Sequence, residues 1–278
     1  MQLVKLNLAR NCLKYLIRTY GINEIFIPYY TCPAVWIAAR EEGCRIIFYH
    51  IDKNFYPVNP FPQNAYIIYT NYFGMCSENC RKLAAKYKNL IIDNSQAFYT
   101  QPEGLASFYS LRKFFNVPSG AFLYTRKLSQ ENFEQDNLNL NPANFHNNYT
   151  DFVKNELTLN KEKSIKNISE LSKKLFEKID FEKDKNTRIS LFKEYKKILN
   201  KDNYIKLSPD ENEIPYCYPF CPKKDLYKEK TLKNNIILLK LWKNYPPNMP
   251  EATLNNTAAL PLNDIQYAQK ILQIFSEK

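Results

Sequence analysis

Three polar residues that could bind a ligand or catalyse a reaction lie at or just after the ends of two short apolar segments in the first half of the chain. Asp93 ends the segment NLIID, Gln96 follows it by three residues, and Lys113 comes shortly after the segment ASFYS. If both segments are strands of one parallel sheet, their carboxyl ends share an edge, which is where ligands bind in α/β proteins. The order therefore predicts an acid, an amide and an amine on one rim of the sheet.

Such a set suits the chemistry of pyridoxal phosphate. This cofactor requires a lysine amine for its aldehyde and a carboxylate that keeps its ring nitrogen protonated. The amide of Gln96 can donate to the ring oxygen, and a phosphate is bound by backbone N–H groups at a helix N-terminus. Ala9, Arg10 and Asn11 open the first expected helix with no acidic side chain among them, and they fit the phosphate role.

Taken singly, the three residues on the rim have simpler explanations. Asp93 can be a turn or cap residue, Gln96 a loop donor, and Lys113 a surface lysine, because exposed lysine is the norm. Other chemistries have less support, since no P-loop or glycine-rich dinucleotide turn is present and neither His50 nor His146 lies near a candidate motif. The interpretation therefore depends on the surrounding elements.

Up to about Thr125, short apolar segments alternate with amphipathic ones, a pattern typical of an α/β domain. Strands separated by helices of this length predict a largely parallel sheet with right-handed crossovers. The expected strands are residues 24–28, 44–51, 65–72, 89–93, 106–110 and 120–125, and the expected helices are 8–21, 33–42 and 77–88.

The rest of the chain has a different texture. Residues from about 126 to 150 are rich in Asn, Pro and Gln, and they predict a connection. From 152 to 200 the pattern is helical, with an apolar stripe that runs from Leu157 to Ile179. Later segments predict strands at 203–207 and 213–220 and helices at 231–244 and 264–275. The predicted division is an α/β large domain (1–130), a connection (131–150) and a smaller C-terminal α+β domain (151–278).

Composition narrows the class of protein. The hydrophobic fraction of 45% argues against disorder. The sequence contains no stretch of about 20 apolar residues, which is the length needed to span a membrane. The N-terminus lacks the features of a signal peptide, so we expect a cytoplasmic protein with its seven cysteines as free thiols. The pairs Cys76/Cys80 and Cys217/Cys221 have three-residue gaps, where a zinc site prefers two, and we expect no metal.

The net charge of +11 has two further interpretations. The excess lies mostly after residue 150, where Lys alternates with Glu and Asp, and such a pattern is typical of the solvated faces of helices. A weaker functional interpretation is that the basic surface attracts an anionic substrate. A nucleic-acid-binding module would rest on net charge alone and has the least support.

In this order the segments resemble the DegT/StrS-type aminotransferase family, which are fold type I pyridoxal phosphate enzymes. The resemblance runs through nearly the whole chain, and no single motif is decisive. Its motifs are LARNCLKYL, IPYYTCPAV, EEGCRIIFYHID, NYFG, IIDNSQAF, SFYSLRKFFNVPSGAFLYT, the segment ending at Arg188, and LPLNDIQYAQKILQIF. The family usually has a segment before the phosphate loop, and we expect this chain to begin almost at the loop.

The resemblance implies roles for individual residues. Lys113 would be the lysine that forms the imine, Asp93 would contact the pyridine nitrogen, and Gln96 would lie near the phenolic oxygen. Ser107 or Ser110 would contact the phosphate together with the loop before the first helix. The residue that stacks on the ring would be Tyr30, Cys32 or the residue between them. The phosphate loop of this chain is poorer in Gly, Ser and Thr than that of the family. The set expected to bind the cofactor is Ala9, Arg10, Asn11, Tyr30, Cys32, Asp93, Gln96, Ser107, Ser110 and Lys113.

By resemblance, the reaction would move an amino group from glutamate to a keto group of a nucleotide-linked sugar, for surface polysaccharide. A fold type I site usually lies at a dimer interface, which implies a homodimer. Two alternatives stay open. One is a pyridoxal phosphate enzyme of another reaction type, such as a dehydratase, a decarboxylase or a non-sugar aminotransferase. The other is a binding protein of the same fold that has lost catalysis.

Overall fold

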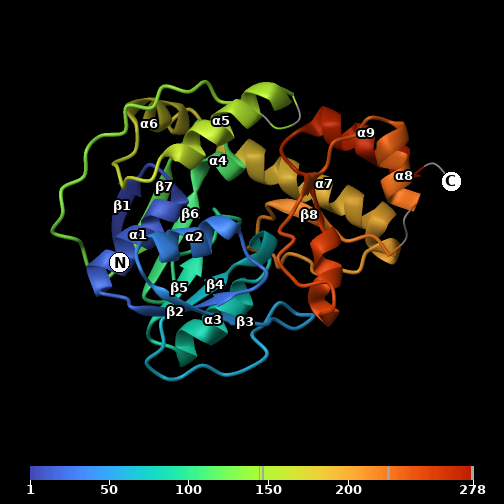
Figure 1. Ribbon diagram of the computed structural model, residues 1–278. Helices are drawn as coiled ribbons and strands as arrows, with labels where there is room; N and C mark the ends of the chain where they lie inside the picture. The colour runs from blue at the N-terminus through green and yellow to red at the C-terminus, as the bar shows by residue number, and fades with distance from the viewer. Residues whose placement is uncertain (144, 146, 224–225, 277–278) are drawn as a thin grey trace.

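The computed structural model describes residues 1–143, 145, 147–223 and 226–276, so His146 lies outside the described residues. A seven-stranded sheet forms the centre of the first half, in the order β1-β7-β6-β5-β4-β2-β3 (Figure 1). Its strands are β1 (Gln2–Leu6), β2 (Glu24–Pro28), β3 (Arg45–Tyr49), β4 (Ile67–Thr70), β5 (Leu90–Asp93), β6 (Ala106–Ser110) and β7 (Ala121–Thr125).

The predicted sheet is confirmed as largely parallel. Strands β3, β2, β4, β5 and β6 run parallel, whereas β7 is antiparallel to β6 and β1 is antiparallel to β7. Strand β1 was not predicted. It lies at the edge of the sheet, and four of its five residues are exposed or half-buried, so it lacks the apolar alternation that would mark it in the sequence.

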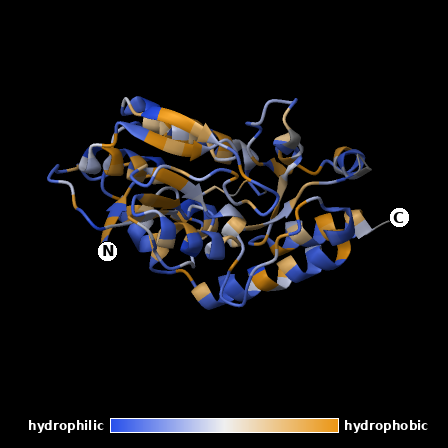
Figure 2. Cartoon of the chain, turned by 90° about the horizontal axis from the view of Figure 1, so that it is seen from below, coloured by the Kyte–Doolittle hydropathy of each residue, from blue (hydrophilic) through white to orange (hydrophobic). Residues whose placement is uncertain are grey.

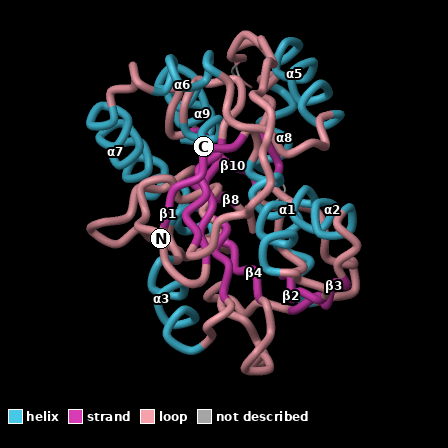
Figure 3. The backbone as a smooth tube through the Cα atoms, turned by 90° about the vertical axis from the view of Figure 1, so that its left-hand side faces the viewer, coloured by secondary structure: helices cyan, strands magenta, loops and turns pink. Residues whose placement is uncertain are grey.

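Helices cover both faces of this sheet, as the tube in Figure 3 shows. On one face lie α1 (Ala9–Tyr20) and α2 (Pro33–Glu41), and on the other lies α3 (Ser77–Lys86). Helix α1 ends as predicted at Gly21, whose φ of 63° is left-handed and suits a residue without a side chain. A single turn, α4 (Leu111–Phe114), joins β6 to the loop before β7.

The second half contains α5 (Tyr149–Lys161), α6 (Glu170–Phe176), α7 (Phe181–Leu199), α8 (Leu226–Lys233) and α9 (Ile265–Ser276). A three-stranded antiparallel sheet, β8 (Cys217–Phe220), β10 (Ala258–Pro261) and β9 (Leu239–Lys240), packs with α7 and α9. Short 3-10 helices are η1 (Tyr72–Gly74), η2 (Asn200–Asp202) and η3 (Pro250–Asn256). The proposed division at 1–130, 131–150 and 151–278 stays a prediction.

Three predictions for this half are wrong. Residues 203–207 form no strand beyond an isolated bridge between Asn203 and Pro222. The helix expected at 231–244 ends at Lys233, because Asn235 adopts a φ of 50° and the apolar residues that follow contribute β9 to the small sheet. The apolar stripe from Leu157 is interrupted as well, since Leu157 is 58% exposed and three separate helices occupy the region.

The core follows the two faces of the large sheet. Along β4, Ile67 and Tyr69 pack with α3 and the second half of the chain, whereas Ile68 packs with α1 and α2. Figure 2 shows hydrophobic residues on the central strands, while the helices carry hydrophobic and hydrophilic residues on different sides. Among the described residues, no helix has the length and apolar composition needed to cross a bilayer.

Candidate active site

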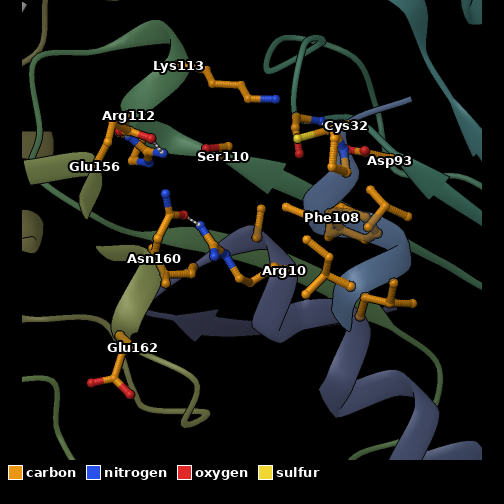
Figure 4. Close-up of a pocket in the computed structure, with 18 of the residues that line it drawn as sticks. Arg10, Cys32, Asp93, Phe108, Ser110, Arg112, Lys113, Glu156, Asn160 and Glu162 are labelled. Carbon is orange, nitrogen blue, oxygen red and sulfur yellow. Dashed lines mark hydrogen bonds and ion pairs between the residues drawn. The ribbon is translucent and has the colours of Figure 1, made fainter. Parts of the chain in front are cut away.

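A cavity of about 440 Å³ lies where the carboxyl ends of β5 and β6 meet the start of α1 and the start of α2. Helix α5 forms its outer wall (Figure 4). The predicted site residues that line it are Ala9, Arg10, Cys32, Asp93, Ser110 and Lys113. The structure therefore brings together the acid and the amine of the predicted rim.

Lys113 reaches the cavity from α4, the single turn after β6. The turn is held in place by its two buried residues, Leu111 and Phe114, and by a hydrogen bond from the Leu111 N–H to Gly120 O at 3.0 Å. The Lys113 side chain points across the cavity toward Cys32 and Asp93 (Figure 4). Its Nζ forms no hydrogen bond or ion pair with any described residue, so the amine is available to a ligand.

Asp93 is the last residue of β5, and only 4% of its surface is exposed. Its Oδ1 accepts the backbone N–H of Ser95 at 2.9 Å, which fixes the carboxylate at the start of the loop. Burial, and after it the charge of Asp93, raises the pKa of the Cys12 thiol well above its usual range. The thiol therefore stays protonated beside the carboxylate, and Asp93 is the acid that this side of the cavity offers to a ligand.

The N-terminus of α1 supplies the positive side of the cavity. Leu8, at the N-cap, offers no side-chain hydrogen bond, and the first turn contains no acidic residue. The partial positive charge of the helix end is thus unopposed by its own side chains. Arg10 donates from Nη2 to Asn160 Oδ1 at 2.8 Å. Burial, and then the nearby cation of Arg112, lowers the pKa of Arg10.

Two of the other predicted residues have their side chains engaged in the scaffold. Gln96, expected beside the ring oxygen, accepts the N–H of Phe73 at Oε1, at 3.0 Å, and does not line the cavity. Asn11 is fully buried, and its Nδ2 donates to Asn7 Oδ1 at 2.9 Å and to Ser164 O at 2.7 Å. The backbone N–H of Asn11, the group expected to bind phosphate, donates to Leu8 O at 3.0 Å.

Tyr30 and Ser107 likewise lie away from the cavity lining. Tyr30 is fully buried, its hydroxyl donates to Leu254 O at 3.2 Å, and its ring stacks on Tyr72. Ser107 Oγ donates to Glu103 O at 2.8 Å. Of the alternatives that the sequence left open for the ring-stacking and phosphate roles, Cys32 and Ser110 line the cavity.

The cavity residues that sequence reasoning missed include Arg112, Glu156 and Asn160. Arg112 is adjacent to Lys113 and could have been considered on that ground. Glu156 and Asn160 lie on α5, and their partners are 44 and 150 residues away in the sequence, a separation that gives no local signal. Among the described residues, no cluster of His, Cys, Asp and Glu could hold a metal ion.

These residues fit pyridoxal phosphate. The volume lies in the range of small-molecule sites, roughly 300–1,000 Å³. Lys113 offers an unpaired amine, Asp93 offers a buried carboxylate, and the α1 N-terminus with Ser110 offers donors for a phosphate. The one poor match is Cys32, which cannot stack on a ring as an aromatic side chain does.

No protein-family model and no curated protein matches the sequence. Solved structures do match over nearly its whole length. A DegT DnrJ EryC1 StrS aminotransferase from Brucella abortus is 13% identical, with a TM-score of 0.66 over 99% of this chain and 85% of that chain. PseC from Helicobacter pylori, an aminotransferase involved in the biosynthesis of pseudoaminic acid, is 16% identical, with a TM-score of 0.61 over 99% and 86%.

The sugar aminotransferase CalS13 from Micromonospora echinospora is 11% identical, with a TM-score of 0.65 over 99% of this chain and 86% of that chain. At these identities the likeness establishes a shared fold. The fold predicted from the DegT/StrS resemblance is therefore confirmed.

Proposed function

We propose that this chain, which has the fold of the DegT/StrS-type aminotransferases, is a pyridoxal phosphate-dependent aminotransferase. The observation that carries the proposal is that Lys113, Asp93, Ser110 and the N-terminus of α1 line one and the same cavity. An amine without a partner, a buried acid and a phosphate-binding helix end are the three groups that this cofactor requires.

The residues divide the work between them. When bound, pyridoxal phosphate supplies an aldehyde for amines and a ring that withdraws electrons. Asp93 would hold a proton on the ring nitrogen, and this favours the cofactor's electron-withdrawing form. Lys113 Nζ would hold the cofactor and, once released, would move a proton to and from the substrate carbon as general base and acid. Ser110 and the N–H groups of Ala9 and Arg10 would bind the phosphate.

The finer assignment concerns the substrates. We propose glutamate as the amino donor and a nucleotide-linked keto sugar as the acceptor, in the synthesis of surface polysaccharide. The fold shared with sugar aminotransferases supports this assignment. We further propose a cytoplasmic homodimer.

The absorbance spectrum of the purified chain with pyridoxal phosphate tests the cofactor assignment. An imine with Lys113 should give a band at about 410–430 nm, and Lys113→Ala should lose it. Lys163→Ala is a matched control, because Lys163 also lines the cavity but pairs with Glu41 at 3.1 Å. If Lys113→Ala keeps the band and Lys163→Ala behaves identically, Lys113 is not the lysine that holds the cofactor.

Cys32 favours a second candidate, which is another reaction on the same cofactor or binding without turnover. A thiol at the position of a stacking ring binds the cofactor ring less tightly and changes its environment. Incubation with glutamate separates the candidates. An aminotransferase should convert the band to the shorter-wavelength pyridoxamine form, whereas a chain that binds cofactor without this reaction should keep its spectrum.

A further inference from the structure

The outer wall of the cavity contains an ion pair that the proposed function does not use. Arg112, next to Lys113, donates from Nη1 to Glu156 Oε1 and from Nη2 to Glu156 Oε2, the second at 3.0 Å. The two parallel bonds bring one edge of the guanidinium against both carboxylate oxygens. Figure 4 shows the pair at the side of the cavity, with Lys113 and Ser110 close to Arg112.

Positive charge exceeds negative charge on this wall. Arg10 has a neutral hydrogen-bond partner, the side-chain oxygen of Asn160, at 2.8 Å. Arg10 and Arg112 line the same cavity, and the pKa of Arg10 is lowered by its burial and then by the charge of Arg112 (Figure 4). Two cations therefore share one carboxylate, that of Glu156.

The remaining carboxylates of the outer cavity are engaged by lysines. Glu41 pairs with Lys14 at 2.5 Å and with Lys163 at 3.1 Å, and Glu162 pairs with Lys166 at 2.7 Å. Neither Glu41 nor Glu162 forms an ion pair with Arg112 or Arg10, so Glu156 is the carboxylate that pairs with this wall. The excess positive charge of the two arginines favours the binding of a small anion here.

The carboxylate of Glu156 is held in a way that lets an incoming carboxylate replace it as the partner of Arg112. It lies on α5, which buries only Leu159 among its residues, so few apolar contacts hold the helix down. The side chains of the ion pair are 23% and 27% exposed. A competing carboxylate could form the same two bonds to Arg112, while the carboxylate of Glu156 turned out to the water that already reaches it.

We propose that Arg112, with Arg10 beside it, binds the carboxylate of the amino donor, and that Glu156 is an internal ligand which the donor displaces. The assignment rests on the proposed aminotransferase function. A guanidinium edge matches the two oxygens of a carboxylate, and Glu156 already shows that geometry. The proposed function assigns the cofactor's phosphate to a different part of the cavity, the α1 N-terminus and Ser110.

Glutarate is a suitable probe because it has both carboxylates of glutamate but neither an amino nor a keto group. Its affinity is measured by titration calorimetry with the full chain, saturated with pyridoxal phosphate. Glu156→Gln removes the internal competitor, and glutarate should bind on the order of tenfold more tightly. Arg112→Gln removes the site, and glutarate should bind at least about tenfold more weakly, as expected when a charged hydrogen-bond donor is lost.

Glu42→Gln is the matched control. Glu42 accepts two bonds from Arg18, at 2.7 and 3.0 Å, outside the cavity, so its loss should leave glutarate affinity unchanged. The gain expected for Glu156→Gln cannot come from misfolding. Equal affinities in the wild-type chain and in both cavity variants would overturn the proposal. So would a gain in inorganic phosphate affinity without a gain for glutarate, because it would assign the wall to phosphate.

The same titrations without cofactor separate this proposal from the aminotransferase assignment. If the imine band is absent but glutarate affinity still depends on Arg112 and Glu156, the carboxylate site stands and the proposed reaction fails. If the imine band is present and is lost in Lys113→Ala, but glutarate affinity is the same in the wild type and in the Arg112 and Glu156 variants, the reaction stands and the carboxylate site fails.

Discussion

Replacing Arg188 with methionine should destabilise the fold and disturb the cavity together. Arg188 lies on α7 and is fully buried. Its guanidinium donates to Asp184 Oδ2 at 2.8 Å and to the main-chain oxygens of Phe114 and Tyr216, each at 2.9 Å. Because Phe114 ends the turn that carries Lys113, this one side chain ties the proposed catalytic lysine to the second half of the chain.

The cost can be worked from these contacts. In Arg188→Met the two carbonyls lose buried donors, at about 1–3 kcal/mol for each group left unsatisfied. Asp184 keeps the hydroxyl of Tyr99 at 2.7 Å and is 15% exposed, which softens the loss of its ion pair. Breaking a buried ion pair by removing one partner costs about 3–5 kcal/mol. Because the loss of the ion pair is softened, we expect a total near the lower end of the combined contributions, about 5 kcal/mol in the free energy of unfolding.

Urea unfolding followed by circular dichroism measures this loss. Arg45→Met is the control, because Arg45 is 75% exposed and its bond to Glu24 at 3.1 Å should contribute no more than about 1 kcal/mol. Arg188→Met should also weaken the imine band at saturating cofactor, since α4 loses its anchor. A stability loss for Arg188→Met no larger than that of the control would refute the reasoning.

Three further predictions concern the cavity and its frame. Cys32→Phe should tighten pyridoxal phosphate binding about two- to tenfold in a fluorescence titration, because a ring contact contributes about 0.5–1.5 kcal/mol; Cys32→Ser should not. Glu41, whose pKa is lowered chiefly by the hydrogen bond from Lys14, stabilises the fold above its unfolded pKa of about 4.3. The stability difference between the wild type and Glu41→Gln, measured by urea unfolding, should therefore shrink as pH falls below that value toward the lower folded pKa. Gly74→Ala should lower the melting temperature strongly, because its φ is 76° and a Cβ would lie 2.6 Å from the main-chain oxygen of Gln96; an unchanged melting temperature would contradict the backbone described here.

Much of the first half of the fold could be predicted from its sequence because local signals agree there. Apolar segments of four to five residues alternate with helices, and Gly21 and Gly43 end α1 and follow α2 with φ values of 63° and 72°. In the second half the signals conflict. The apolar residues after Asn235 suit a helix by periodicity, but their pairing with β10 is a long-range contact that periodicity does not report.

The candidate site was predictable in part for the same reason. The predicted strand ends are enough to locate Asp93 and Lys113 on one rim of the sheet. They do not tell to which face of the sheet a side chain points. Ser107 and Ser110 are three residues apart on β6, so they point to opposite faces, and only the known packing of Phe108 with α1 shows which serine faces the cavity.

Reduction with borohydride, followed by mass spectrometry of the tryptic peptides, tests the central claim most directly. The wild-type chain saturated with pyridoxal phosphate should carry a stable cofactor adduct on Lys113, and Asp93→Asn should reduce its yield by weakening cofactor binding. An adduct on other lysines alone, or none at saturating cofactor, would contradict the assignment of this cavity as a pyridoxal phosphate site.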